Sequence, residues 1–111
     1  MVETFLQITE ENFAANVTKA AQTTLILFYK DGSTSCDIQV PELEAIIKEY
    51  QERITFARLN VDEQANLTKQ LNVDAIPTLV FFRNASEIYR IKGIMMRDKL
   101  RRQLEGVLLS N

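Results

Sequence analysis

The stretch ITFARLNVDEQANLTKQLNVDAIPTLVFF, residues 54–82, is the part of the sequence that indicates the fold most clearly. Its first seven residues, Ile54–Asn60, alternate in a way that predicts a β-strand. Residues 63–71 carry two leucines four positions apart, which favours a short helix with one apolar face. Pro77 then precedes Thr78–Phe82, a nearly uniform apolar run that is typical of a buried strand. The stretch therefore predicts a strand, a helix and a second strand, with a proline at the entrance to the second strand.

Two further pairs of a strand and a helix are predicted before this stretch. Thr23–Tyr29 (TTLILFY) is apolar almost throughout, as expected for a central parallel strand that is buried on both faces. The helix that follows extends to about Arg53, and Pro41 inside it is expected to kink it. The residues predicted to face inward from this helix are Ile38, Leu43, Ile46, Ile47 and Tyr50.

The chain opens with a predicted strand, Thr4–Ile8, and a predicted helix over residues 10–21. Thr9 is suited to cap that helix, because its hydroxyl can accept a hydrogen bond from a free backbone N–H of the first turn. Phe13 can pack against Ile8 across the cap as a hydrophobic staple.

After residue 82, Glu87–Ile91 is predicted to pair back on the preceding strand as a hairpin, and Arg97–Leu109 forms a last amphipathic helix. The order β-α-β-α-β-α-β-β-α predicts an α/β fold, with a mixed five-stranded sheet flanked by four helices. Strands separated by helices are expected to run parallel, and the closing hairpin adds an antiparallel edge. We expect a single domain over residues 1–111.

The composition excludes several classes of function. The net charge of −2 argues against general nucleic-acid binding, and no apolar run approaches the ~20 residues of a membrane span. The absence of histidine removes histidine-based catalysis and most zinc sites, so neither a metal nor another cofactor is expected. The single cysteine cannot form an internal disulfide, and the first residues lack the basic and apolar segments of a signal peptide. We therefore expect a cytoplasmic protein.

Basic residues gather toward the C-terminus, where residues 83–111 carry a charge of +4 against −6 for residues 1–82. Two interpretations are open for the basic residues of the last helix: a solvated helix face, or a patch for an acidic partner. These residues are Arg97, Lys99, Arg101 and Arg102.

Several segments, in the same order and at the same spacing, closely resemble the thioredoxin family over nearly the whole chain. They are LILFYKDGSTSC at residues 25–36, VPELEAIIKEY at residues 40–50 and the stretch at residues 54–82. Ile76-Pro77-Thr78 matches the family's cis-proline motif, and Gly93 matches a glycine after the hairpin. The resemblance implies the thioredoxin fold, thiol–disulfide oxidoreductase chemistry in cell redox homeostasis, and protein clients that carry thiols or disulfides.

The active-site segment departs from the family pattern. Where the family has Trp-Cys-Gly-Pro-Cys, this chain has GSTSC at residues 32–36, so only the last cysteine is kept. The buried acid of the family's central strand falls at Leu27, and its lysine partner becomes Arg58. Disulfide reduction needs one thiol to attack and a second to resolve the mixed disulfide. Because Ser33 stands at the attacking position, it stays open whether this chain is an enzyme.

The site residues implied by the resemblance each have two interpretations. Ser33 is the position of the missing nucleophile, and it is also well suited to cap the following helix. Cys36, at the resolving position, is either a buried, inert side chain or a monothiol that forms mixed disulfides with protein thiols or glutathione. Ile76 and Pro77 are either turn residues only or part of a surface to which an extended client can pair. The candidate binding residues are Gly32, Thr34, Ser35, Ile76 and Pro77.

Three functions stay open. The first is a divergent thioredoxin-like protein that binds clients or forms mixed disulfides without full turnover. The second is an active dithiol disulfide reductase whose first active-site cysteine was replaced by Ser33 through engineering. The third is a redox-inactive protein-interaction module in which Cys36 is dispensable. The combined loss of the family's tryptophan, glycine, proline and buried acid favours the first, because one engineered substitution changes only one position.

Overall fold

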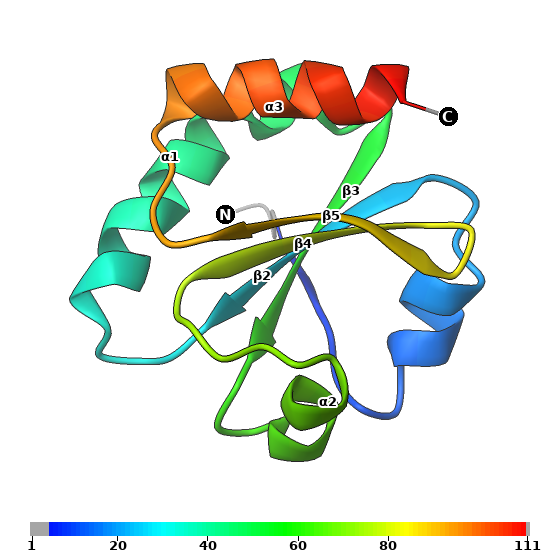
Figure 1. Ribbon diagram of the computed structural model, residues 1–111, viewed down its shortest axis with the longest axis vertical. Helices are drawn as coiled ribbons and strands as arrows, with labels where there is room; N and C mark the ends of the chain where they lie inside the picture. Colours follow the sequence, from blue (N-terminus) through cyan, green and yellow to red (C-terminus); the bar gives the residue numbers. More distant parts are fainter. Residues whose placement is uncertain (1–4, 111) are drawn as a thin grey trace.

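The computed structural model describes residues 5–110, which form five strands and four helical elements (Figure 1). The elements in chain order are β1 (Leu6–Gln7), η1 (Ala14–Thr18), β2 (Thr23–Tyr29), α1 (Thr34–Tyr50), β3 (Ile54–Asn60), α2 (Ala65–Gln70), β4 (Thr78–Arg83), β5 (Ser86–Lys92) and α3 (Arg97–Leu109). The element η1 is a short π-helix, and the other three helices are α-helices. Among residues 5–110, no helix is both long and apolar enough to cross a membrane.

The strands form one mixed sheet in the order β1-β3-β2-β4-β5. The strands β1, β3 and β2 run parallel, whereas β4 and β5 join by antiparallel pairing. The helices α1 and α3 cover one face of the sheet, and η1 and α2 cover the other (Figure 1). The predicted α/β class, with a mixed five-stranded sheet and four helices, is confirmed.

The central strand β2 explains why its sequence is apolar almost throughout. Leu25 and Leu27 belong to the hydrophobic core beneath α1 and α3, whereas Ile26 and Phe28 belong to the core beneath η1 and α2. All four side chains are completely buried. Successive strand residues point to opposite faces, so a strand covered on both faces needs apolar residues at every position.

One strand direction differs from the prediction: β4 runs antiparallel to β2. A parallel strand would require the connection after β3 to carry the chain back along the full length of the sheet. The helix α2 has six residues and spans only about 9 Å, whereas a seven-residue strand such as β3 spans about 23 Å. The chain therefore enters β4 at the same edge at which it left β3.

The N-terminal elements are shorter than predicted. The strand β1 consists of Leu6–Gln7, and Thr4, its predicted first residue, lies outside the described residues. The helix predicted over residues 10–21 is replaced by turns and the short π-helix η1, where the N–H of Lys19 donates to the carbonyl of Ala14 at 2.9 Å. Only Val17 of η1 is buried, so little packing stabilises a longer helix in this segment.

The hydrogen bond expected of Thr9 as a cap is present, although the helix that it was predicted to cap is replaced by turns and η1, whose own N-cap is Phe13. The Thr9 N–H donates to Oδ1 of Asn12 at 2.8 Å, and the Asn12 N–H donates to Oγ1 of Thr9 at 3.2 Å. Ile8 is buried in the core beneath η1 and α2, and Phe13 packs against the same core. The hairpin prediction is also confirmed, with β4 and β5 joined through Asn84 and Ala85, both at positive φ as two-residue hairpin turns require.

Candidate functional site

The predicted site residues meet at the edge of the sheet where β2 ends and β4 begins. Phe28 pairs with Thr78 in the antiparallel ladder between these strands. The loop that leaves β2 leads through Gly32 into α1, and the loop that ends at Pro77 leads into β4. The register therefore places the Gly32–Cys36 segment and the segment before Thr78 at the same edge.

Ser33 caps α1, as the sequence predicts. Its backbone is extended, with φ −84° and ψ 119°, and its Oγ accepts a hydrogen bond from the N–H of Cys36 at 3.3 Å. Gly32 precedes it with φ +80°, a conformation that is strained for a residue with a side chain. The serine hydroxyl thus satisfies one of the backbone N–H groups that a helix start leaves unpaired.

Cys36 is buried in the first turn of α1. Its side chain is 4% exposed and its thiol is free. Its neighbours in the loop are more accessible, since Thr34 is exposed and Ser35 is half-buried. We therefore expect a reagent or a client disulfide to contact the sulfur only after a local opening.

The inward face of α1 differs from the predicted one by a single residue. Ile38 is 44% exposed, so its predicted place in the core is wrong. Gln39 is completely buried in its place, and both ends of its amide bond to the backbone of Met95. Helical spacing was the signal that could have found it, because Gln39 lies three residues after Cys36 and four before Leu43.

The loop before β4, residues 71–77, is referred to here as the Pro77 loop. The Ile76–Pro77 peptide bond is cis, which confirms the cis-proline motif that the resemblance implied. Pro77 is buried and its carbonyl accepts a hydrogen bond from the N–H of Gly93 at 2.8 Å. Ile76 is half-buried, and within residues 5–110 neither its N–H nor its carbonyl takes part in a backbone hydrogen bond. The loop thus presents free backbone groups beside the start of α1.

Arg90 on β5 fixes the start of the Pro77 loop by hydrogen bonds, a role that the sequence analysis did not predict. Its guanidinium donates to the carbonyls of Leu71 and Asn72 at 2.7 and 2.9 Å. It also forms a bidentate pair with Glu87, whose hydrogen bond raises the pKa of Arg90. These bonds connect the end of α2 to β5 and limit how far the loop can move.

The position of the family's buried acid is apolar here, and the position of its lysine partner is an arginine that lies over an aromatic ring. Leu27 is completely buried and lies opposite Arg58 in the register between β2 and β3. The Arg58 guanidinium lies over the Tyr29 ring, 5.5 Å from its centroid, and its Nε donates to Gln7 at 2.8 Å. No acidic residue stands at the Leu27 position to accept a proton from Cys36. Among residues 5–110, no three or more Asp, Glu or Cys side chains lie close enough together to hold a metal ion.

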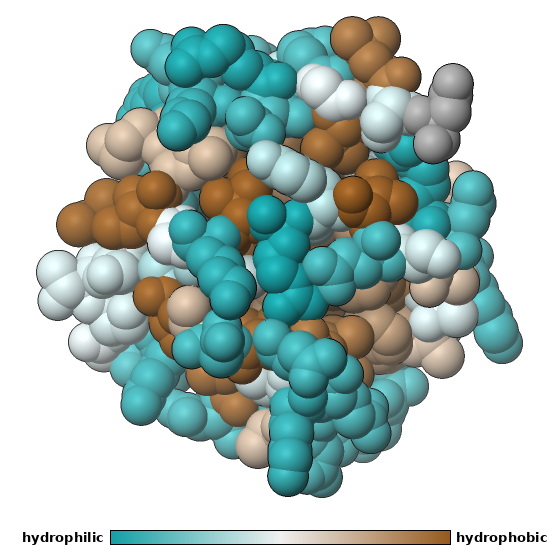
Figure 2. All heavy atoms as spheres, in the orientation of Figure 1, coloured by the Kyte–Doolittle hydropathy of each residue, from teal (hydrophilic) through white to brown (hydrophobic). Residues whose placement is uncertain are grey.

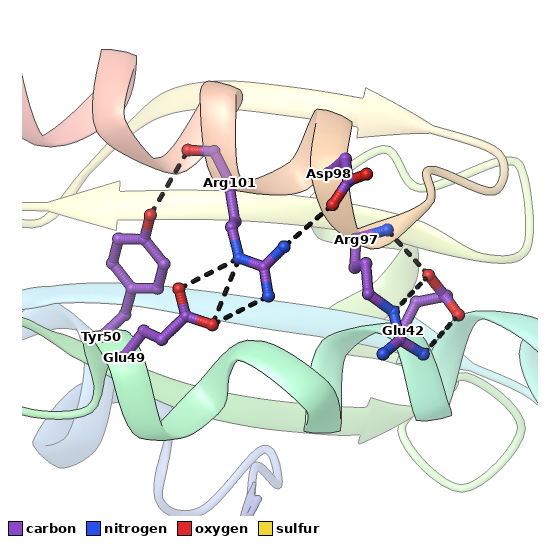
Figure 3. Close-up of polar contacts among 6 residues, drawn as sticks. All are labelled: Glu42, Glu49, Tyr50, Arg97, Asp98 and Arg101. Atoms are coloured by element: carbon purple, nitrogen blue, oxygen red, sulfur yellow. Dashed lines mark hydrogen bonds and ion pairs between the residues drawn. The ribbon is translucent and has the colours of Figure 1, made fainter.

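Two of the basic residues in the last helix bind α1 (Figure 3). Arg97 pairs with Glu42 at 3.1 Å, and Arg101 pairs with Glu49 at 2.9 Å. These hydrogen bonds lower the pKa of both glutamates. Burial, with a hydrogen bond to Glu105, raises the pKa of Tyr50 to about 12.

The two interpretations of the basic residues can now be weighed. Lys99 and Arg102 are exposed, and hydrophilic side chains gather over α3 in the space-filling view (Figure 2). Arg97 and Arg101 instead connect α3 to α1. The arrangement favours a solvated helix that is fastened to its neighbour over a continuous basic patch for an acidic partner.

The fold and this edge define a class of protein: a thioredoxin-fold chain with a serine at the helix cap and one cysteine three residues later. Comparison with known proteins agrees with the fold. The thioredoxin family model matches residues 4–106. A thioredoxin of Alicyclobacillus acidocaldarius subsp. acidocaldarius is 28% identical over 103 residues, which cover 93% of this chain and 97% of that protein. A thioredoxin of Acidithiobacillus ferridurans is 31% identical over 83 residues, 75% of this chain and 77% of that protein.

A longer relative is also similar. The bifunctional thioredoxin reductase/thioredoxin of Mycobacterium leprae (strain TN) is 28% identical over 103 residues, which cover 93% of this chain but only 22% of that protein. The family match spans most of the chain, so this chain belongs to the thioredoxin family, a family of redox oxidoreductases that act on protein thiols and disulfides.

Proposed function

We propose that this single-domain protein is a cytoplasmic, client-binding member of the thioredoxin family that acts in cell redox homeostasis without completing a disulfide-reduction cycle. One observation carries the proposal: among residues 5–110 the backbone N–H and carbonyl of Ile76 have no backbone partner, at the edge where Ser33, and not a thiol, caps α1. Relative to the family pattern, this chain retains the proposed client-binding surface but has Ser33 in place of the thiol that would attack client disulfides.

The clients that fit this edge are extended segments of proteins with thiols or disulfides. An extended peptide can pair its own backbone with the N–H and carbonyl of Ile76, as a strand added to a free edge does. Ile94, which follows the Gly93 that bonds to Pro77, is 41% exposed and offers an apolar contact. Binding of this kind requires no cysteine in the protein.

Cys36 adds one covalent step to this binding. Its thiolate attacks a client disulfide or glutathione disulfide, the old S–S bond breaks, one thiolate leaves, and a mixed disulfide remains. No second thiol of this chain can displace the partner, because Cys36 is its single cysteine. The mixed disulfide therefore persists until an external thiol attacks it, and the protein captures its partner for that time.

Burial of Cys36 predicts a slow thiol in the free protein. We expect native Cys36 to react with an aromatic disulfide reagent at least about tenfold more slowly than in protein unfolded by urea, because its side chain is 4% exposed. Absorbance of the released aromatic thiolate measures both rates at the same pH. The rate in urea is corrected for the effect of urea on the reactivity of the reagent. Equal rates would mean that the thiol is freely accessible, and the need for local opening would be wrong.

A binding experiment tests the client surface. The probe is reduced, carboxymethylated α-lactalbumin, which is unfolded and has no free thiol, so that only non-covalent binding is seen. We expect Ile76→Asp to weaken binding about tenfold, because a charge must then be desolvated where the client pairs. Ile88→Asp is the matched control, since Ile88 is an exposed isoleucine on β5 at 38% exposure. Fluorescence anisotropy of labelled probe measures the affinity.

The outcomes of that experiment separate the functions. Cys36→Ala should bind the probe as the parent protein does, because the surface does not depend on the thiol. Equal weakening by Ile76→Asp and Ile88→Asp, or no binding by the parent protein, would overturn the client-binding proposal. A redox-inactive interaction module would bind the probe and yet form no mixed disulfide with glutathione disulfide, which mass spectrometry of the intact protein detects.

The second candidate is a dithiol disulfide reductase whose attacking cysteine was replaced by Ser33. The geometry at the cap supports this candidate, because the Ser33 Oγ lies 3.3 Å from the backbone nitrogen of Cys36 at the start of α1. A cysteine at the same place would lie close to Cys36. The codon for residue 33 in the native gene decides between the two candidates.

A further inference from the structure

Gln39 is a completely buried polar side chain near the start of α1, and its amide is bonded at both ends to one distant residue. Its Nε2 donates to the carbonyl of Met95 at 3.0 Å, and the Met95 N–H donates to its Oε1 at 2.7 Å. This pair of hydrogen bonds to the N–H and the carbonyl of one residue resembles the paired bonds between opposite residues of neighbouring antiparallel strands. The side chain of Gln39 thus acts toward Met95 as an added strand would.

The segment that Gln39 contacts, residues 93–96, alternates between outward and inward side chains. Ile94 is 41% exposed and Met96 is 54% exposed, whereas Met95 between them packs against the core beneath α1 and α3. This alternation is the pattern of an extended strand with one buried face. The pairing at Met95 therefore decides which two side chains of the segment face the solvent.

The same segment is bonded to the Pro77 loop two residues earlier. The Gly93 N–H donates to the Pro77 carbonyl at 2.8 Å, and Gly93 has φ +84°, which allows the chain to bend there. The segment is thus held on one side by the Pro77 loop and on the other by Gln39. Cys36 and Gln39 lie three residues apart and are both buried, so they share one face of α1. Hydrogen bonds and the chain between Gly93 and Met95 therefore connect Gln39 to Pro77.

We propose that Gln39 is a positioning residue that keeps residues 93–96 in register with the Pro77 loop and so preforms the surface for clients. The inference rests on the proposed function. The aligned surface places exposed Ile94 and Met96 after the residue that bonds to Pro77, and it therefore fits extended client segments with apolar side chains at alternate positions. A preformed surface costs less ordering on binding, which strengthens the affinity without any contact between Gln39 and the client.

The substitution Gln39→Met tests this role, because methionine has a similar length and no amide. We expect amide hydrogen exchange, measured by NMR at residue level, to become about tenfold faster at Met95, which loses a bond partner, and also at Gly93. Gly93 is the decisive readout, because it bonds to Pro77 and not to Gln39. We also expect the affinity for carboxymethylated α-lactalbumin to fall about fivefold.

The matched control is Tyr50→Phe at the far end of the same helix. It removes the 2.7 Å hydrogen bond between the Tyr50 hydroxyl and Glu105, and it should leave both the exchange at Gly93 and the affinity for the probe unchanged. Exchange at Gly93 that does not change in Gln39→Met, or that rises only as much as in the amides of β2, would overturn the positioning role. Faster exchange at Gly93 with unchanged affinity would overturn the link to clients. A parent protein that binds no probe would defeat the proposed function, while the exchange at Gly93 would still decide the role of Gln39.

Discussion

The variant Ser33→Cys is expected to reduce disulfides roughly a thousandfold faster than the parent protein does. The new sulfur would lie at the N-terminus of α1, where the helix dipole and free N–H groups lower the pKa of a thiol. Ser33 already accepts a hydrogen bond from the Cys36 N–H, and a thiolate there can accept the same bond. The rate of insulin disulfide reduction with dithiothreitol as the reductant measures the gain.

The expected cycle uses both sulfurs. The thiolate at position 33 attacks the insulin disulfide, one insulin thiolate leaves, and Cys36 then attacks the mixed disulfide and releases the second insulin thiol. Dithiothreitol reduces the internal disulfide that is left. The double variant Ser33→Cys/Cys36→Ala is the control, because it can attack but cannot resolve, and it should accumulate the mixed disulfide. Background activity in Ser33→Cys, with both cysteines shown to be reduced and the protein folded, would mean that the altered loop has lost more than one thiol.

Leu27→Asp is expected to destabilise the protein by about 3–5 kcal/mol at pH 8, although it restores the acid that the family has at this position. Leu27 is completely buried, and Arg58 opposite it is engaged with Tyr29 and Gln7. Burial without a partner disfavours the charged carboxylate, so the folded protein raises the pKa of the new side chain above its unfolded value of about 3.9. The folded state then binds the proton more tightly than the unfolded state does.

The pH dependence follows from that sign. Because the folded state holds the proton at a pH where the unfolded state has released it, stability falls as the pH rises above the unfolded pKa, and the full cost is reached above the folded pKa. Urea unfolding at pH 5 and pH 8 measures the difference. Leu27→Asn is the matched control, since it loses the same packing but cannot titrate. If the two variants have the same stability difference between pH 5 and pH 8, the buried environment assigned to residue 27 is wrong.

Both experiments bear on why this chain diverges from its family. In the proposed role, the protein completes no thiol cycle for which a buried acid would have to manage protons. Leu27 in that place fills the core beneath α1 and α3 with apolar volume. The proposed role therefore accounts for both the missing acid and the missing attacking thiol.

Parts of the fold could be predicted because they depend on residues close together in the chain. The apolar run of β2 indicated a strand covered on both faces, and Ser33 indicated a helix cap from its position before α1. The helix predicted over residues 10–21 was wrong, because the spacing of its apolar residues did not show that only Val17 would be buried in η1. Ile38 was predicted to face inward but is exposed. It follows the buried Cys36 by two residues, and residues at that spacing do not share a helical face.

The sequence was sufficient for the family, the central strand, the Ser33 cap and the broken cysteine pair, because each is a local pattern in the order of residues. Tertiary structure decided the direction of β4, the burial of Cys36 and the role of Gln39. Gln39 and Met95 are 56 positions apart, and no local pattern marks them as partners. A buried amide finds its hydrogen-bond partner only when the whole fold brings a free backbone group to it, because burial removes water as the alternative.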